Sequence, residues 1–147
     1  MRRKWISLLL AASMVLSPSY LFPGAAMALT EQDDSGYSTY ECEDGEVLGN
    51  AVVSTSFSGY TGDGSVVCGM VPVQGVTLSN VTVPEEGDYT VLIRYGQSNW
   101  SARTMYVYAN GNEADAQQVV FPKLKSWGLW DQIPVTVHLN AGVNTLT

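Results

Sequence analysis

Two tryptophans three residues apart, Trp127 and Trp130, are the residues whose type and spacing point most clearly to chemistry. They flank Gly128 in a loop that follows a proline-containing segment and precedes an alternating apolar stretch. One indole of such a pair can enter the core, while the loop can hold the other flat on the surface. An exposed indole stacks well on another flat, weakly polar face, such as a sugar ring or a base. The alternative for Trp127 is a core position.

Two acidic residues, Glu41 and Glu43, form a second candidate site. Residues 39–43 (TYECE) alternate like a strand, which would place both carboxylates on one face, about 6.5–7 Å apart. Like charges at that distance repel unless a cation lies between them or water screens them. A cation site and a solvated pair both remain open.

The other polar residues assemble no catalytic site. His138, the single histidine, is expected on the polar face of a strand without a serine–aspartate arrangement. Glu85 and Glu86 are adjacent in a turn, so their side chains point apart and cannot act as an acid/base pair. The glycine-rich residues 59–64 lack the lysine of a phosphate-binding loop. We therefore expect no catalysis from these residues, whereas a longer parent protein could be a hydrolase.

The N-terminus is typical of a secretory signal peptide. Three basic residues at positions 2–4 precede an apolar run at residues 6–16, and residues 26–28 (AMA) match a small-x-small cleavage pattern. We predict a signal peptide at 1–28, cleavage after Ala28 and a secreted protein. The apolar run is too short for a permanent membrane anchor.

The remaining residues, 29–147, carry 14 acidic and four basic side chains, a net charge of −10. This charge repels nucleic acid and anionic lipid, so we expect a neutral partner or a cation. Cys42 and Cys68 would face an oxidising compartment. There they can form a disulfide or remain two separate buried thiols, because spacing does not fix their geometry.

The hydrophobic pattern predicts an all-β fold. After a flexible lead-in at 29–38, apolar and polar residues alternate, and turn residues separate the short runs. The expected strands are residues 39–43, 65–68, 76–83, 89–95, 104–108, 117–121, 135–139 and a last strand from 143 that is cut off at 147. Such regular short strands predict an antiparallel sandwich at 39–147.

Six motifs resemble the β-sandwich carbohydrate-binding modules of families 6 and 35, with a preference for family 35. Each motif has little specificity alone, but all six occur in the family's order. They are residues 40–43 (YECE), 58–64 (SGYTGDG), 87–95 (GDYTVLIRY), 108–111 (YANG), 127–130 (WGLW) and 139–145 (LNAGVNT).

The resemblance implies a jelly-roll of two antiparallel sheets with a structural calcium and a sugar site in the loops at one end. Glu41 and Glu43 would bind the calcium, together with an aspartate that would lie beyond Thr147, so the site would be incomplete here. Trp127 would stack on the sugar, Asn144 would hydrogen-bond to it, and Tyr60 would add a contact.

The function implied is non-catalytic carbohydrate binding. Such a module would hold a C-terminal catalytic domain of the same chain on its polysaccharide, with β-mannan as the leading ligand and xylan among the open alternatives. The alternative hypothesis is a cell-surface or adhesive structural sandwich that binds no free sugar and buries Trp127.

Overall fold

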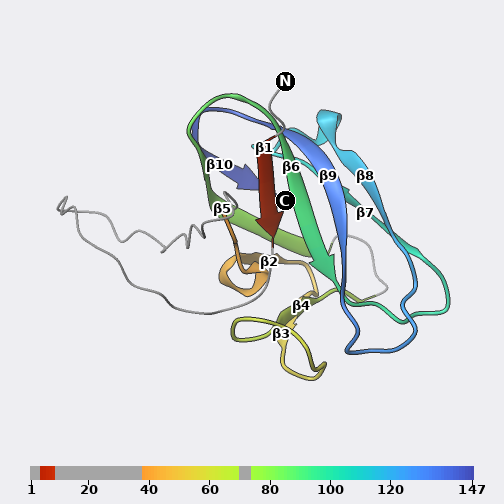
Figure 1. Ribbon diagram of the computed structural model, residues 1–147. Helices are drawn as coiled ribbons and strands as arrows, with labels where there is room; N and C mark the ends of the chain where they lie inside the picture. Colours follow the sequence, from red (N-terminus) through yellow and green to blue (C-terminus); the bar gives the residue numbers. More distant parts are fainter. Residues whose placement is uncertain (1–3, 9–37, 70–73) are drawn as a thin grey trace.

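The computed structural model describes residues 4–8, 38–69 and 74–147 (Figure 1). These residues form strands and two short 3-10 helices, and they contain no α-helix; no helix among them is long and apolar enough to cross a membrane. The strands are β1 (Lys4–Leu8), β2 (Glu46–Leu48), β3 (Val52–Ser54), β4 (Ser65–Val67), β5 (Gly75–Val83), β6 (Gly87–Tyr95), β7 (Arg103–Val107), β8 (Gln117–Phe121), β9 (Asp131–Leu139) and β10 (Gly142–Leu146). The 3-10 helices are η1 (Cys42–Asp44) and η2 (Glu113–Asp115).

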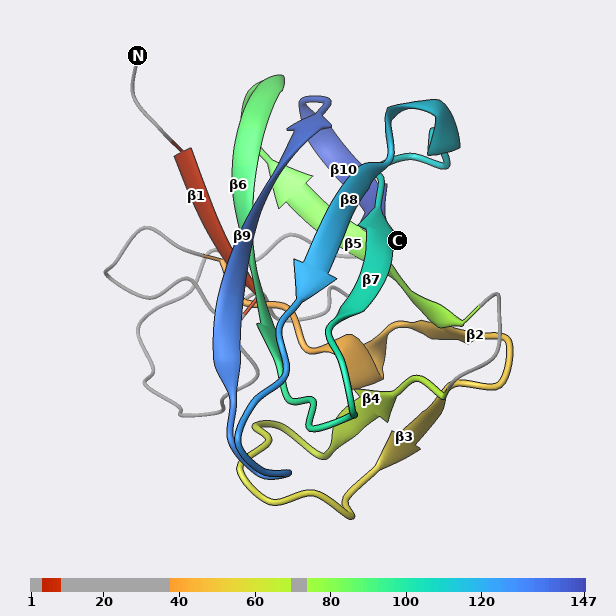
Figure 2. The same cartoon turned by 90° about the vertical axis from the view of Figure 1, so that its right-hand side faces the viewer.

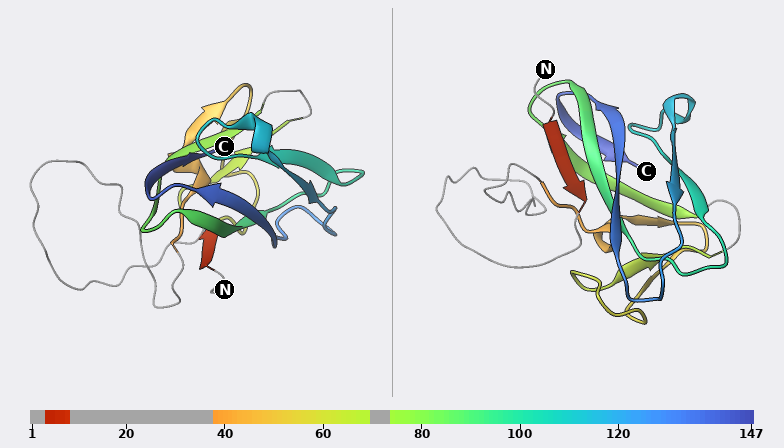
Figure 3. Two further views of the ribbon diagram at one scale, coloured as in Figure 1. Left: turned by 90° about the horizontal axis from the view of Figure 1, so that it is seen from above. Right: turned by 45° about the vertical axis from the view of Figure 1, so that its right-hand side comes forward.

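The strands pair in four groups and form a sandwich, in which β6 and β9 face β5 and β10 while the β3-β4 pair lies at one end (Figures 2 and 3). Their orders are β1-β6-β9, β10-β5-β2, β3-β4 and β7-β8. Every pair is antiparallel except β1 with β6, which is parallel. The predicted all-β sandwich is therefore confirmed.

The core forms where strand alternation turns apolar side chains inward. In β6, Tyr89 and Val91 are buried, and they pair with the buried Val137 and Val135 of β9. Side chains from β5, β7, β8 and β10 complete the same cluster. Burial of this apolar surface is the main force holding the sandwich together.

One predicted segment differs from the structure, and the predicted signal peptide is described only in part. The strand expected at 39–43 is wrong: Cys42–Asp44 form η1, closed by a 3.1 Å bond from the Gly45 amide to the Cys42 carbonyl. Within the predicted signal peptide, Lys4–Leu8 form β1 beside β6. The rest of that peptide and nearly all of the predicted lead-in fall in residues 1–3 and 9–37, outside the described residues. Cleavage after Ala28 therefore stays a prediction.

Candidate sugar-binding loops and carboxylate site

Three loops meet at one end of the sandwich. They are residues 55–64 between β3 and β4, 96–102 between β6 and β7, and 122–130 between β8 and β9. Tyr95 pairs with Asp131, so the loop that leaves β6 starts beside the loop that enters β9. Figure 2 shows all three loops at the lower end of the sandwich, near β3 and β4. The strand register thus brings together side chains that are far apart in the sequence.

Trp130 fixes the 122–130 loop on the 55–64 loop. Its Nε1 donates a 2.9 Å hydrogen bond to the carbonyl oxygen of Ser58. The guanidinium of Arg94 lies over the ring, 4.8 Å from its centroid, and also donates a 2.7 Å bond to the Gly59 carbonyl. Trp130 is half-buried in these contacts. Trp130 is thus the packed member of the tryptophan pair.

Trp127, three residues earlier, remains accessible. Its side chain is 47% exposed, and its ring stacks on Phe57 with centroids 4.8 Å apart and planes at 24°. Stacking on Phe57 occupies one face of the indole and limits its rotation. The result is a fixed aromatic surface that offers the rest of the indole to a flat partner. Tyr60, in the same loop as Phe57, is half-buried.

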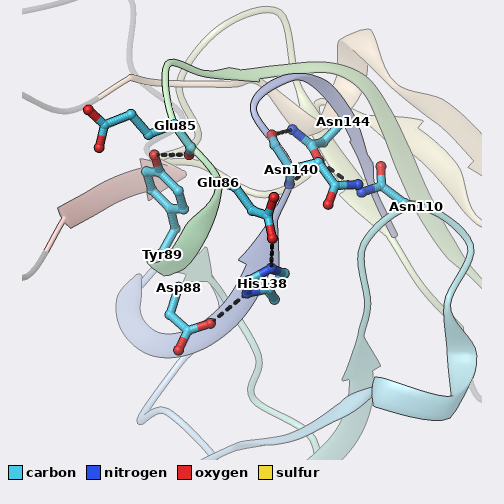
Figure 4. Close-up of polar contacts among 8 residues, drawn as sticks. All are labelled: Glu85, Glu86, Asp88, Tyr89, Asn110, His138, Asn140 and Asn144. Atoms are coloured by element: carbon cyan, nitrogen blue, oxygen red, sulfur yellow. Dashed lines mark hydrogen bonds and ion pairs between the residues drawn. The ribbon is translucent and has the colours of Figure 1, made fainter.

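Asn144 has a structural role at another place. It is 1% exposed and lies in β10, beside the β9–β10 turn (Figure 4). Its Oδ1 accepts bonds from Asn110 Nδ2 at 2.8 Å and from the Asn140 amide at 2.9 Å. Its Nδ2 donates to the carbonyl of Asn140 at 2.8 Å and to that of Gly142 at 3.1 Å. Since this amide is already satisfied and buried, we exclude Asn144 from the sugar contacts proposed below.

The two glutamates of the carboxylate pair converge on Gly62, although η1 replaces the expected strand. The Glu41 and Glu43 carboxyl carbons lie 3.2 and 3.3 Å from the position that a Cβ on Gly62 would take. Gly62 has a φ of +61°, so both space and backbone conformation favour glycine there. Two acidic side chains therefore share a narrow space under the 55–64 loop.

The electrostatics of this pair fit a bound cation. Glu43 Oε1 accepts bonds from the amides of Asp63 and Gly64, at 2.9 and 3.1 Å, whereas Glu43 Oε2 is buried without a hydrogen-bond partner. Burial, followed by the nearby charges of Glu43 and Asp44, raises the pKa of Glu41 to about 7. A cation beside these oxygens would satisfy Oε2 and remove the repulsion.

Calcium suits these ligands because it takes six to eight oxygens, several of them carboxylate. Glu41 and Glu43 would supply carboxylate oxygens on this side of the ion. No group of three or more His, Cys, Asp or Glu side chains arranged to hold a metal occurs in the described part of the chain. Further ligands would therefore be carbonyl oxygens, water or other residues of the protein.

Cys42 and Cys68 are free thiols in the structure. The disulfide that the sequence left open is not formed here. Burial, with the charges of Glu43 and Glu41, raises the pKa of the Cys42 thiol to about 12. Burial also raises the pKa of the Cys68 thiol above its ordinary value, and the nearby charge of Arg103 offsets only part of this rise. Both groups are therefore protonated and weakly nucleophilic at neutral pH.

Sequence reasoning missed Phe57 and the role of the loop that carries it. One end of that loop holds Phe57 against Trp127, and the other end covers Glu41 and Glu43. The available signal was Phe57 itself, an aromatic residue one position before the 58–64 motif. Its partner could not be identified without the fold, because 70 positions separate it from Trp127.

Comparison with known proteins finds no matching family model. A 1,6-alpha-glucosyltransferase from Sporosarcina globispora is 33% identical over 107 residues, which cover 73% of this chain and 8% of that protein. The chain thus spans less than a tenth of the length of this curated relative.

Solved structures give a similar result. A Listeria monocytogenes protein in complex with alpha-D-glucose, beta-D-glucose, magnesium and calcium matches with a TM-score of 0.64 and 34% identity over 73% of this chain and 10% of that chain. A family 35 carbohydrate-binding module from Clostridium thermocellum matches with a TM-score of 0.65 and 29% identity over 73% of this chain and 80% of that module. The chain therefore has a jelly-roll β-sandwich like that of the family 35 carbohydrate-binding modules.

Proposed function

We propose that this domain binds a neutral polysaccharide without cleaving it and holds a larger secreted carbohydrate-active enzyme on that substrate. The observation that carries the proposal is Trp127, which is 47% exposed and fixed on one face by Phe57. A structural sandwich without a ligand would be expected to bury this indole. Exposed, preorganised aromatic surface is instead typical of a binding site, because little side-chain freedom remains to be lost on binding.

The proposed ligand class is a glucan. The resemblance in sequence alone favoured β-mannan, and nothing in the comparisons supports mannan or xylan. The 1,6-alpha-glucosyltransferase and the glucose-bound Listeria protein both act on or bind glucose-containing molecules, as their names state. A neutral glucan also suits a domain whose residues 29–147 carry a net charge of −10, since no charge repulsion opposes its approach.

The proposed role of Glu41 and Glu43 is to bind one structural calcium ion. The convergence of the two side chains on Gly62 and the unpaired Glu43 Oε2 support this role. The ion would supply positive charge between two carboxylates and hold the 55–64 loop from below. It would contact no sugar, so its effect would be on stability and on the position of Phe57.

The direct test is affinity electrophoresis of the protein through gels that contain dextran, pullulan, soluble starch, galactomannan or xylan. We expect retardation by a glucan, and loss of that retardation in Trp127→Ala. Tyr106→Ala is the matched control, because Tyr106 is also an exposed aromatic residue, 60% accessible, on strand β7 rather than in these loops. Unretarded migration of the wild-type protein in every gel would overturn the proposal.

A further inference from the structure

Trp100 is the most exposed large hydrophobic residue in the described part of the chain, with 96% of its side chain accessible. It lies in the 96–102 loop between β6 and β7, outside the contact between Trp127 and Phe57. A tryptophan exposed to this extent loses the burial energy that an indole normally contributes to folding. A binding partner outside the protein therefore explains this exposed indole better than packing in the core does.

The backbone on both sides of Trp100 is fixed by one buried amide. Gln97 is only 7% exposed, and its Oε1 accepts a 3.0 Å bond from the backbone amide of Asn99. Its Nε2 donates to the carbonyl of Ser101 at 3.3 Å and to that of Phe121 at 3.0 Å. The residues immediately before and after Trp100 are thus both bonded to Gln97. This arrangement holds the indole outward on an ordered loop, which lowers the entropy cost of binding.

The Trp100 loop is also bonded to the Trp127 loop. The amide of Leu124 donates a 2.8 Å bond to the carbonyl of Gln97, and Ser98 Oγ donates to the Leu124 carbonyl at 3.4 Å. Trp100 and Trp127 each lie three residues from this junction. Chain geometry therefore limits their Cα atoms to a separation of no more than about 27 Å. Both loops lie at the same end of the sandwich (Figure 2).

We propose that Trp100 is a second ring-stacking position, and that the ligand is an extended neutral saccharide chain that contacts Trp100 and Trp127 together. The inference rests on the proposed function and deepens it, because it assigns the site to chains rather than to single sugars. Each indole offers a flat apolar face, and the acidic surface disfavours an anionic ligand. Two contacts on one ligand increase affinity because the second contact forms within the complex.

The test is a calorimetric titration of the full protein with glucose and with linear gluco-oligosaccharides of increasing length. In the wild type, affinity should rise with chain length beyond the unit that Trp127 alone can bind. Trp100→Ala should remove that rise and weaken binding of the longest ligand by about fivefold to tenfold, while binding of the short ligands stays unchanged. Trp100→Phe should restore most of the rise, and Trp127→Ala should weaken short and long ligands alike.

The outcomes separate this inference from the function on which it rests. If Trp100→Ala binds the longest chain as tightly as the wild type while Trp127→Ala does not, the second position is refuted and sugar binding stands. Equal weakening of short and long ligands by Trp100→Ala would also refute it, because Trp100 would then belong to the Trp127 contact itself. If the wild type binds no gluco-oligosaccharide of any length, the glucan assignment fails together with this inference, and the gels with galactomannan and xylan decide whether neutral polysaccharide binding itself stands. Trp100→Ala should fold normally, since it removes an exposed side chain, and an unchanged melting temperature checks this.

Discussion

The indole of Trp130 and the carbonyl of Ser58, 72 positions apart in the sequence, are joined by a 2.9 Å hydrogen bond that ties the 122–130 loop to the 55–64 loop. Because of this bond, the stacking surface of Trp127 does not depend on its own loop alone. The loop that carries Phe57 is held at one end by Trp130 and at the other by Glu43. The stacked pair of Trp127 and Phe57 and the two carboxylates are therefore connected through one short segment.

A methyl group at position 59 should disturb this junction. Gly59 has a φ of +86°, and a Cβ there would lie 2.8 Å from Trp130 Nε1. Gly59→Ala is expected to lower the free energy of unfolding by about 1–3 kcal/mol, from backbone strain and displacement of the indole. Urea unfolding followed by tryptophan fluorescence measures this change. Gly111→Ala is the control, because Gly111 also has a positive φ of +69° but nothing lies within 4 Å of a Cβ at that position; equal losses in both variants would contradict the proposed contact.

The sequence predicted the sheets well because burial enforces a period of two. Residues 89–95 alternate in sequence with Tyr89, Val91, Ile93 and Tyr95 on one face; of these, Tyr89, Val91 and Tyr95 are buried and Ile93 is partly buried against the same core. The strand at 39–43 was predicted on the same alternation, but it lies where the chain turns into η1. Short alternating runs at the edge of a domain carry no information on whether a partner strand is available.

The candidate site was predicted only in part. The glycine-containing loop before a strand indicated that one indole of the pair could pack and the other could be exposed, and the family resemblance assigned the exposed role to Trp127. Asn144 shows where sequence reasoning fails, since a motif assigns a position but does not reveal that Asn110 and Asn140 already use its amide. Phe57 and Gln97 were not identified, because Phe57 stacks on a residue of another loop and Gln97 joins its own loop to the Phe121 carbonyl of β8.

The charge of His138 should make stability depend on pH. Hydrogen bonds to Asp88 at 2.9 Å and Glu86 at 3.4 Å raise the pKa of His138 above its ordinary value of 6.5 (Figure 4). The folded state therefore binds this proton more tightly than the unfolded state does. The stabilisation is complete below about pH 6.5 and is lost as the pH rises through the folded pKa. We expect a small effect, because the side chain is exposed and water screens its contacts.

Melting temperatures measured from pH 5 to pH 9 check this expectation. The difference between the wild type and His138→Gln should be largest at the acidic end and should shrink as the pH rises. Asp88→Asn should reduce the same difference, because it removes the shorter of the two contacts. A difference between wild type and His138→Gln that is constant over this range would show that the contacts do not shift the pKa.

Calcium should stabilise the protein through Glu41 and Glu43. An ion that binds only the folded state adds about 2.7 kcal/mol at a concentration 100 times its dissociation constant, which raises the melting temperature. The double variant Glu41→Gln, Glu43→Gln should lose this rise and should melt higher than the wild type in chelator, since it no longer holds two repelling carboxylates. Glu46→Gln, which alters an exposed carboxylate on β2, should respond to calcium like the wild type. If the wild type melted at the same temperature in calcium and in chelator, the proposed binding of calcium by Glu41 and Glu43 would be contradicted.

The two cysteines should react slowly in the folded protein and rapidly after unfolding. Burial raises the pKa of Cys42 to about 12 and that of Cys68 above its ordinary value, so little thiolate is present at pH 8. In 6 M urea without reductant, a chromogenic disulfide reagent should react rapidly with two thiols per chain. The same reagent in buffer should react over a much longer time, with Cys42, the more deeply buried thiol, reacting last. Cys42→Ala and Cys68→Ala assign the two phases. Absence of reactive thiols in urea would instead show that the protein contains the Cys42–Cys68 disulfide that the sequence left open.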